Sequence, residues 1–499
     1  MQALNLEQRQ PLHDLATTRQ HETTAAAALP AHTLMQRAGL ATAQLAQALA
    51  PHARCIWIAC GSGNNGGDGL EAALQLHQRG RPVQVTWLGQ PERAPADAHA
   101  AWQRARQAGV VFCSTAPTLG PQDLCIDALL GIGLAPDRPT NAAHAALHTC
   151  LQALHTSAAP VLCVDVPSGL CCDSGQYLTP FAPSGPPASA RHTLSLLTLK
   201  PGLFTGAGRD AAGRIWFDDL GAAASHTTAC AWLPGAPAHQ VRAHASHKGS
   251  FGDVVIVGGE GLAARGLGMG GAAVLAARAA LHAGAGRVLL APLDADAPGI
   301  DASQPELMLR QVTALDWAQL TVVCGCGGGA AVRPVLAQVL ALAPRLVLDA
   351  DALNAIAAEA PLQQALHQRA AQGQATVLTP HPLEAARLLG THTAQVQAQR
   401  LQAAQTLATR FACTVVLKGS GSIIAAPGQP PAINPTGNAR LATAGTGDVL
   451  AGLLGTRLAQ TADAWSAACA ACWQHGALAD AWPPAQALTA SRLAQALTP

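Results

Sequence analysis

The chain has 499 residues, of which 49% are hydrophobic and 12% charged, and its formal net charge is +1. This length predicts two or three domains, and the hydrophobic share is large enough for buried cores, which excludes a mainly disordered chain. The low and balanced charge also excludes a nucleic-acid-binding protein, because such a protein needs a basic face.

Short apolar runs alternate with long helical stretches rich in Ala, Leu and Gln in both halves of the chain. This order is typical of βα units around a parallel sheet. The predicted strands are Cys55–Cys60, Val83–Leu88, Leu124–Leu129, Val161–Val166, Asp253–Gly258, Arg287–Ala291, Thr321–Gly325, Leu346–Asp349, Ala375–Leu378 and Thr414–Leu417. The sequence therefore predicts two α/β domains, residues 1–221 and 246–499, joined by a linker at 222–245 that has little periodicity.

A glycine-rich loop, residues 61–69, lies between the first predicted strand and a helical run at Leu70–Arg79. Its glycines let backbone N–H groups approach an anion, and the following helix N-terminus adds its dipole. The spacing is not G-x-G-x-x-G, so the usual dinucleotide fingerprint does not fit. Because Asn64, Asn65 and Asp68 place polar side chains in the loop, we favour a bound polar ligand over a purely structural turn.

Two more polar segments follow predicted strands, at the sheet edge where open α/β sheets bind ligands. Asp127 precedes Gly131-Ile132-Gly133, and Asp165 precedes Ser168. A carboxylate that leaves a buried strand is costly unless it is paired, binds a cation or transfers a proton. One Asp could simply cap the next helix. Two Asp residues at the same sheet edge as the glycine-rich loop indicate a binding or catalytic site.

Together with Leu34–Gly39 and Lys200–Leu203, these motifs make residues 15–221 resemble the NAD(P)H-hydrate epimerase family. The resemblance implies a Rossmann-like domain that interconverts the R and S epimers of hydrated NADH and NADPH, with Asp165 as the acid/base residue on the substrate. It also implies a potassium ion, held by the oxygen ligands that suit a hard cation: Asn65, Asp127 and Ser168. The loop residues that would contact the substrate are Asn64, Asn65, Gly66, Gly67, Asp68, Gly131, Ile132 and Gly133.

In the second half, Gly445-Thr446-Gly447-Asp448 enters a helical run at Val449–Leu458. In such a turn, successive backbone N–H groups point toward the same position, where they can bind an anion. An Asp there can accept a proton from a hydroxyl that attacks phosphorus, although it could also be a helix cap. Lys418 follows a predicted strand and begins a Lys-Gly-Ser-Gly-Ser segment that could line a phosphate site; a solvated surface charge is the alternative.

These segments resemble the ribokinase-like superfamily, and further motifs make residues 246–497 similar to the ADP-dependent NAD(P)H-hydrate dehydratase family. Those motifs are His247–Gly252, Gly271–Ala272, Pro305–Met308, Asp349–Asn354 and Thr379–Pro382. The resemblance implies a ribokinase-like domain in which ADP, with Mg²⁺, phosphorylates the hydrate, and phosphate is then eliminated. Asp448 would be the catalytic base. By position, the hydrate would contact Ala272, Gly327, His381 and Asp448, and the nucleotide would contact Lys418, Gly419, Ser420, Gly421, Ser422 and Gly447.

The sequence departs from the dehydratase pattern at a few positions. Leu383 replaces the usual Gly after His-Pro, Ala444 replaces a common Gly, and Cys326 stands where a Gly-Pro-Gly-Leu-Gly segment has Pro. Since a glycine with positive φ is costly to replace, we expect Leu383 to reshape the loop around His381. His381 itself could serve only for rigid loop packing between two prolines.

Membrane insertion is excluded because charged or titratable side chains interrupt the most apolar stretch, residues 270–292. The N-terminus has no apolar leader, so we expect a cytoplasmic protein whose fourteen cysteines stay thiols. Cys469, Cys472 and His475 could all ligate a metal from one helix. Zinc usually has a fourth ligand, and buried Cys is commonly a small core residue, so we favour core packing.

The leading hypothesis is a two-domain enzyme that repairs hydrated NADH and NADPH, with small-molecule partners only. An ATP-dependent small-molecule kinase of the ribokinase-like fold is the alternative, and it would release a stable phosphorylated product. A non-catalytic nucleotide sensor is a third reading, against which the intact Asp165 and Asp448 argue. The sequence leaves the choice between ADP and ATP and the oligomeric state open; the resemblance favours ADP and a homo-oligomer.

Overall fold

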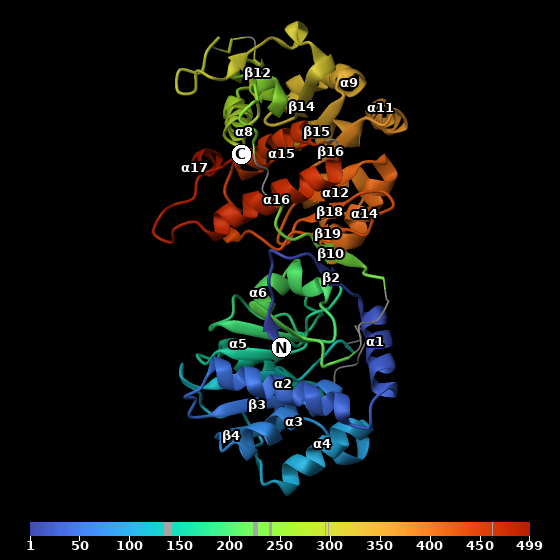
Figure 1. The fold of residues 1–499 in the computed structure, drawn as a ribbon, viewed down its shortest axis with the longest axis vertical. Helices are drawn as coiled ribbons and strands as arrows, with labels where there is room; N and C mark the ends of the chain where they lie inside the picture. Colours follow the sequence, from blue (N-terminus) through green and yellow to red (C-terminus); the bar gives the residue numbers. More distant parts are fainter. Residues whose placement is uncertain (134–141, 223–227, 239–241, 295, 298, 462) are drawn as a thin grey trace. The chain divides into compact units, whose positions relative to one another are not determined.

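The computed structural model describes residues 1–133, 142–222, 228–238, 242–294, 296–297, 299–461 and 463–499 (Figure 1). These residues form two compact units, Met1–Asn5 with Pro11–Ala231 and Leu6–Gln10 with Trp232–Pro499. Both are α/β, as predicted. The segment expected to be a linker, residues 222–245, contains a short strand, β10 (Ala231–Leu233). Within the described part of the chain, every helix is too short or too polar to cross a membrane.

The first unit is built on an eight-stranded sheet of order β1-β9-β8-β7-β6-β3-β4-β5, in which only the β1–β9 pair is antiparallel. Its strands are β1 (Gln2–Ala3), β3 (Ile56–Cys60), β4 (Val83–Trp87), β5 (Val111–Phe112), β6 (Leu124–Ala128), β7 (Val161–Val164), β8 (Arg191–Leu196) and β9 (Arg214–Asp218). Its helices are α1 (Leu15–Ala27), α2 (Thr33–Leu49), α3 (Asn64–Gln78), α4 (Ala96–Gln107), α5 (Ala142–Thr156) and α6 (Gly208–Ala212).

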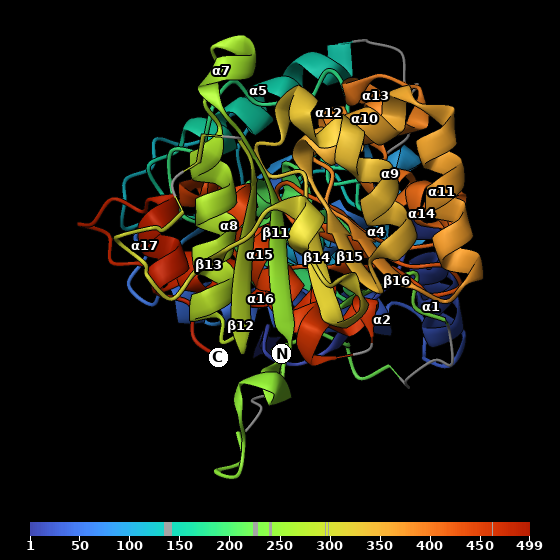
Figure 2. The same ribbon diagram turned by 90° about the horizontal axis from the view of Figure 1, so that it is seen from above.

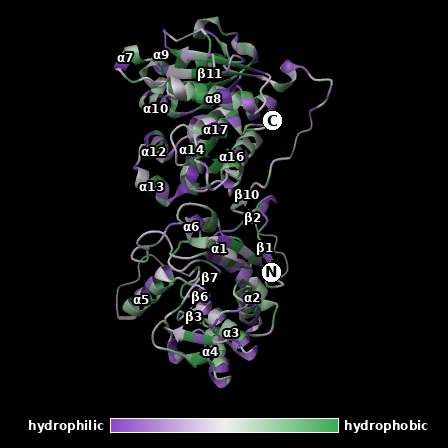
Figure 3. Cartoon of the chain, turned by 90° about the vertical axis from the view of Figure 1, so that its left-hand side faces the viewer, coloured by the Kyte–Doolittle hydropathy of each residue, from purple (hydrophilic) through white to green (hydrophobic). Residues whose placement is uncertain are grey.

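Helices cover both faces of this sheet, so β3, β6 and β7 are buried along their whole length. Helices α2, α3 and α4 pack on one face, and α5 packs on the other around Leu147, Cys150 and Leu154. Hydrophobic residues accordingly gather inside the unit and hydrophilic ones on its outer surface (Figure 3). This packing fixes the carboxyl ends of three parallel strands at one edge, where the predicted site residues begin.

The second unit contains the order β13-β12-β11-β14-β15-β16-β17-β18-β19-β10-β2, parallel from β13 to β17 and antiparallel around β18. Its strands are β11 (Asp253–Glu260), β12 (Arg287–Leu293), β13 (Met308–Leu309), β14 (Leu320–Cys324), β15 (Arg345–Leu348), β16 (Ala375–Leu378), β17 (Thr414–Leu417), β18 (Ile423–Ala425) and β19 (Ala432–Ile433). Strands β2 (Gln10–Leu12) and β10 each straddle a boundary between the units.

Helices cover both faces of this sheet as well. The helices are α7 (Leu262–Arg265), α8 (Gly270–His282), α9 (Arg333–Leu342), α10 (Ala350–Ala358), α11 (Ala360–Ala371), α12 (Pro382–Leu389), α13 (Thr393–Ala398), α14 (Arg400–Phe411), α15 (Thr446–Gln460), α16 (Ala464–Asp480) and α17 (Ala490–Gln495). Helices α8, α15 and α16 share one core and α9, α11 and α14 the other, and α8 and α9 flank the parallel strands in Figure 2. Every strand predicted from the sequence is present.

Candidate active sites

A cavity of about 550 Å³ lies at the carboxyl edge of the first sheet. It is bounded by the loops that follow β3, β6 and β7 and by helix α1. The predicted residues that line it are Asn64, Asn65, Asp68, Gly131, Ile132, Gly133 and Asp165. Gly66 and Gly67 do not line it, because both are packed inside α3: an added methyl group would lie 2.0 Å from the Gly61 carbonyl oxygen and 2.5 Å from the Met35 side chain, respectively.

Asp127 and Ser168 form a buried hydrogen-bonded pair behind the cavity. The Ser168 hydroxyl donates to Asp127 Oδ1 at 2.6 Å, and the Ser168 N–H donates to Oδ2 at 3.0 Å. The Leu130 N–H donates to the Ser168 hydroxyl at 2.8 Å, which ties the β6 loop to the β7 loop. Neighbouring strand ends therefore bring together two of the three residues predicted to hold potassium.

The third predicted ligand, Asn65, lies against the β6 loop. A methyl group on Gly131 would stand 3.1 Å from Asn65 Cβ. The Asn65 amide nitrogen is buried and has no hydrogen-bond partner among the described residues. Turning the amide over would place its oxygen there instead. An amide, a carboxylate and a hydroxyl at one sheet edge are hard oxygen donors, so the residues fit an alkali cation.

Asp165 is held as a paired carboxylate at the end of β7. Its backbone has a left-handed φ of 65°, and the Leu196 N–H donates to Oδ1 at 3.0 Å. The Lys200 ammonium group contacts the same oxygen and also donates to the Leu196 carbonyl at 2.6 Å. Lys200 is completely buried. Sequence reasoning used Lys200 only as part of a motif and missed that it is the partner of Asp165.

Helix α1 contributes a wall of the cavity that the sequence analysis did not anticipate. Thr18, Arg19, Glu22 and Ala26 line the cavity, and their spacing places them on one face of a helix. This spacing is visible in the sequence and could have indicated that these residues share one face of a helix. Burial raises the pKa of the Asp68 carboxyl well above its usual range, and Asp165 and then Glu22 add to the shift by charge repulsion.

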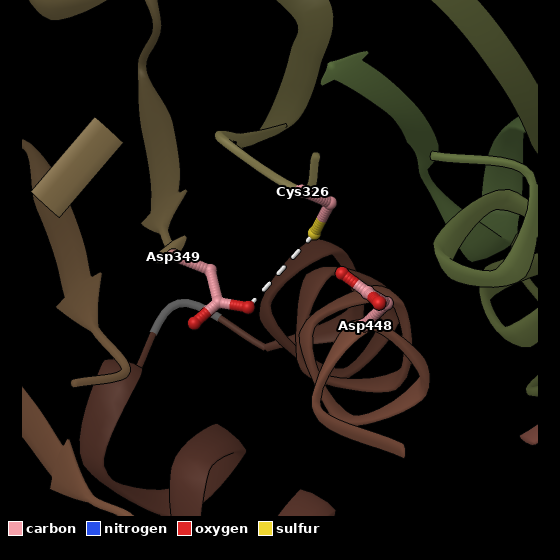
Figure 4. A group of neighbouring side chains, drawn as sticks. All are labelled: Cys326, Asp349 and Asp448. Atoms are coloured by element: carbon pink, nitrogen blue, oxygen red, sulfur yellow. Dashed lines mark hydrogen bonds between the residues drawn. The ribbon is translucent and has the colours of Figure 1, made fainter. Parts of the chain in front are cut away.

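The proposed site of the second unit centres on Cys326, Asp349 and Asp448, whose ligand atoms all lie within 4.8 Å of one another. Cys326 follows β14, Asp349 follows β15, and Asp448 lies in the first turn of α15 (Figure 4). The Cys326 thiol donates to Asp349 at 4.0 Å. Burial, and then the Asp349 charge, raise the pKa of Asp448 to about 6.

Lys418 is paired with Asp349, so it is not a free surface charge. Its ammonium group donates to Asp349 Oδ1 at 2.6 Å, and the Thr379 hydroxyl donates to the same oxygen at 2.8 Å. A methyl group on Gly447 would lie 3.6 Å from Lys418 Nζ. Asp349 thus lies between the predicted base and the predicted nucleotide loop: its carboxylate is within 4.8 Å of the Asp448 carboxylate and is hydrogen-bonded to Lys418.

The segment after Lys418 is anchored by a buried arginine on α14. Arg400 donates to the carbonyl groups of Leu417, Lys418 and Gly421 at 3.3–3.4 Å. Burial lowers the pKa of Arg400 to about 10. The Ser422 hydroxyl donates to the Gly419 carbonyl at 3.2 Å. Five of the six residues predicted to contact the nucleotide, residues 418–422, therefore share a preformed loop.

The glycine-rich turn after β14 places Gly327 beside α8. A methyl group on Gly327 would lie 2.9 Å from Ala272 Cβ, so these two predicted hydrate contacts adjoin. Glu260 accepts the N–H groups of Ala330 and Ala331 at 2.8 and 3.1 Å, and Asp351 accepts the Gly329 N–H at 2.8 Å. A carboxylate at the end of β11 and another in the first turn of α10 thereby hold the turn that carries Cys326.

The expectation that Leu383 reshapes the His381 loop is wrong. Leu383 lies in the first turn of α12 and does not occupy a left-handed position, so no glycine is required there. His381 caps this helix: Nδ1 accepts the N–H groups of Leu383 and Glu384 at 3.1 and 3.3 Å. Burial and the Lys418 charge lower the pKa of His381. Its other ring nitrogen, Nε2, lies 3.2 Å from Glu384 Oε1.

Cys469, Cys472 and His475 in α16 are packed in the second unit, with Cys472 and Cys469 against its core and His475 buried. Across the described ranges, the only group of three metal-capable side chains within ligand distance is the one around Asp448. His475 Nε2 is 2.9 Å from the Thr446 carbonyl oxygen, so this buried side chain supports the first turn of α15. Burial lowers the pKa of His475 to about 4.

Two family models match the chain, one for each unit. The model described as YjeF-related protein N-terminus matches residues 31–202, and the model described as NAD(P)H-hydrate dehydratase matches residues 254–499. A solved structure similar to the second unit is the ADP/ATP-dependent NAD(P)H-hydrate dehydratase of Bacillus subtilis, 27% identical, with a TM-score of 0.43 over 52% of this chain and 91% of that one.

Curated relatives span both units. The bifunctional NAD(P)H-hydrate repair enzyme of Escherichia coli is 36% identical over 478 residues, which cover 91% of this chain and 85% of the relative. The ADP-dependent (S)-NAD(P)H-hydrate dehydratase of Neisseria meningitidis is 42% identical over 268 residues, 52% of this chain and 87% of that protein. From this identity over nearly the whole length, the chain belongs to the family of bifunctional NAD(P)H-hydrate repair enzymes.

Proposed function

We propose that the chain repairs hydrated NADH and NADPH with one active site in each unit. The first unit epimerises the R and S hydrates. The second dehydrates the S hydrate with ADP and gives NAD(P)H, AMP and phosphate. The relatives support this function and not the kinase alternative, and the Neisseria relative supports ADP as the donor. The observation that carries the proposal is the placement of Asp448 in the first turn of α15, beside Asp349 and Cys326.

In the second unit, Asp448 accepts the proton of the hydrate's hydroxyl as that oxygen attacks phosphorus. A pKa near 6 leaves the carboxylate mostly ionised at neutral pH while keeping it basic enough to take a proton. The N–H groups at the start of α15 stabilise the transferred phosphoryl group. The ring nitrogen's electron pair then expels phosphate, and loss of a proton from the neighbouring carbon restores the double bond.

Residues 418–422 hold the nucleotide in this proposal, and Lys418 offsets the negative charge that the phosphates bring near Asp349. Mg²⁺ that enters with ADP would neutralise phosphate charge, and it prefers oxygen ligands and commonly binds one or two carboxylates. The Asp349 carboxylate, in the group that could hold an ion, is the residue that would take this role.

In the first unit, the glycine-rich loop binds the phosphates of the hydrate, and Asp165 acts on the hydrated ring. Potassium, when bound, would supply a fixed positive charge, and Asn65, Asp127 and Ser168 are the residues that would hold it. The buried, unpartnered amide of Asn65 is the structural support for that assignment.

The decisive experiment measures near-ultraviolet absorbance after the purified chain receives an equilibrated mixture of NADH-hydrate epimers, Mg²⁺ and ADP. Recovery of reduced-nicotinamide absorbance from both epimers is the expected result. Recovery that stops at the S fraction would contradict the epimerase assignment. A stable phosphorylated product without absorbance, with ADP or with ATP, would instead favour the kinase alternative.

A further inference from the structure

Helix α1 brings a second carboxyl group into the cavity that holds Asp165. Thr18, Glu22 and Ala26 are spaced four residues apart and line the cavity together, so they share one face of the helix. Glu22 lies N-terminal to the residues matched by the epimerase-side family model, which begin at 31. Besides Asp68 on α3 and Asp97 on α4, the cavity is therefore lined by Asp165 from the β7 loop and Glu22 from α1.

The surroundings of these two carboxyl groups differ. Asp165 is paired, because its carboxylate contacts the Lys200 ammonium group and accepts the Leu196 N–H. The half-buried Glu22 has no hydrogen-bond or ion-pair partner among the described residues. Burial, and then the negative charge of Asp165, raise the pKa of Glu22. Environments that separate two carboxyl groups in this way mark an acid and a base.

Other charged groups also face Glu22. Lys200, from the segment that follows β8, and Arg19, from the same helix, lower its pKa, whereas Asp97 on α4 raises it. Asp68 on α3 is close enough to interact with both Glu22 and Asp165. Because burial and Asp165 outweigh the two cations, the pKa of Glu22 lies above its ordinary value.

The chemistry of epimerisation requires two such groups. Adding water across the enamine double bond of a dihydronicotinamide ring leaves the hydroxyl on the carbon next to the ring nitrogen. In the route through a planar iminium ion, the hydroxyl leaves as water from one face and water returns on the other. A group that donates a proton is needed on the first face and a group that accepts one on the second.

Resting on the proposed epimerase function, we propose that Glu22 is a second catalytic residue of the first unit and acts in a pair with Asp165. Glu22 gives its proton to the hydroxyl, the C–O bond breaks, and the nitrogen electron pair forms a C=N bond as water departs. A water molecule then adds to the opposite face and Asp165 takes its proton. Proton exchange with solvent returns Glu22 and Asp165 to their starting states before the next turnover, and in the reverse direction the two roles exchange. The net change is an isomerisation with one oxygen taken from solvent.

The test follows one purified epimer in H₂¹⁸O with the full chain and no ADP, using chromatography for the epimer ratio and mass spectrometry for the oxygen. We expect the unaltered chain to epimerise faster than the uncatalysed reaction and to incorporate ¹⁸O with each inversion. Glu22→Gln should lower kcat by about 10²- to 10⁴-fold, the usual contribution of a general acid, with little change in KM. Gln20→Ala, an exposed change on the same helix, is the matched control.

Two further readouts separate catalysis from a structural role. The pH profile of kcat should have two limbs in the unaltered chain and lose one in Glu22→Gln. Glu22→Asp, which keeps the acid on a shorter side chain, should restore part of the rate. Rapid epimerisation by Glu22→Gln, or inversion without ¹⁸O, would overturn the inference while leaving the proposed function intact. No epimerisation by the unaltered chain would instead overturn the proposed function, and the inference with it.

Discussion

The proposed dehydratase base owes its protonation behaviour to its immediate neighbours. Burial and the Asp349 charge raise the pKa of Asp448 to about 6. A general base works only when it is unprotonated, so kcat of the dehydratase reaction should fall as the pH drops through about 6. A pH profile of NADH recovery from the S hydrate at saturating ADP measures this limb. A rate that stays flat down to well below pH 6 would contradict the assignment.

Replacing the base should affect turnover and not nucleotide binding. Asp448→Asn keeps the shape of the side chain and removes its basic site, so we expect a loss of about 10²- to 10⁴-fold in kcat. ADP affinity, measured by titration calorimetry, should stay the same. Asp463→Asn offers a control, because Asp463 caps the start of α16 and not that of α15. A variant with full turnover would remove Asp448 from the mechanism.

Cys326 should tune this base, since its thiol interacts with Asp448 and lowers the pKa of that carboxyl. Cys326→Ala removes the interaction, so the acid limb of the dehydratase pH profile should move to higher pH. Cys324→Ala is the matched control, because Cys324 is an equally buried cysteine in the preceding strand. An unchanged limb in the Cys326 variant would show that the thiol only fills space.

The sequence singled out many of the residues that the structure brings together at the two candidate sites, and the residues that it overlooked have a common cause. The residues at strand ends were found because their motifs are continuous in sequence. Lys200 and Glu22 were not recognised, because their link to Asp165 is made only when distant segments fold together. Leu383 was misjudged for the opposite reason: the family pattern suggested a strained position, whereas α12 already begins at the preceding proline.

At the scale of elements, the central strands were predictable and the edges were not. Strands β11 and β14 are long apolar runs because both faces are covered. By contrast, β1, β5, β13 and β19 have only two residues each, which is too short for any periodicity. Their pairing is set by the neighbouring strands. A pattern of two residues is too short to predict which residues of adjacent strands lie opposite each other.

Helix α14 anchors the loop after β17 through a single side chain, that of Arg400. Arg400 on α14 holds residues 417–421 through their carbonyl groups, and a lysine cannot reach the same set of acceptors. Arg400→Lys should therefore raise the KM for ADP in the dehydratase assay by about tenfold or more, the effect of about 1.4 kcal/mol, and leave epimerisation unchanged. Arg410→Lys on the same helix is the control. Equal KM values for ADP in the two variants would contradict the anchoring role.

For the molecule as a whole, the two sites lie in separate units and should work in separate chains. Asp165→Asn alone should recover absorbance only from the S hydrate, and Asp448→Asn alone should recover none. An equimolar mixture of the two variants should recover both epimers, because the epimerised hydrate can diffuse between molecules. The measurement is the final near-ultraviolet absorbance with ADP and Mg²⁺. If the absorbance recovered by the mixture corresponds to the S hydrate alone, the hydrate must pass between the two sites of one chain.

The path of the backbone makes these two enzymes hard to separate by a single cut. Met1–Asn5 belongs to the first unit, Leu6–Gln10 to the second, and the chain then returns to the first before residue 232. Arg9 stacks over Trp232 at 4.0 Å, and the Ala236 N–H donates to the Glu7 carbonyl at 2.8 Å. A dehydratase half released by cleavage after Ala231 would lack this stretch and expose Trp232. The segment Leu6–Gln10 therefore belongs to the second unit although it precedes most of the first unit in the sequence. To produce the two units separately, this segment must be attached to the second unit.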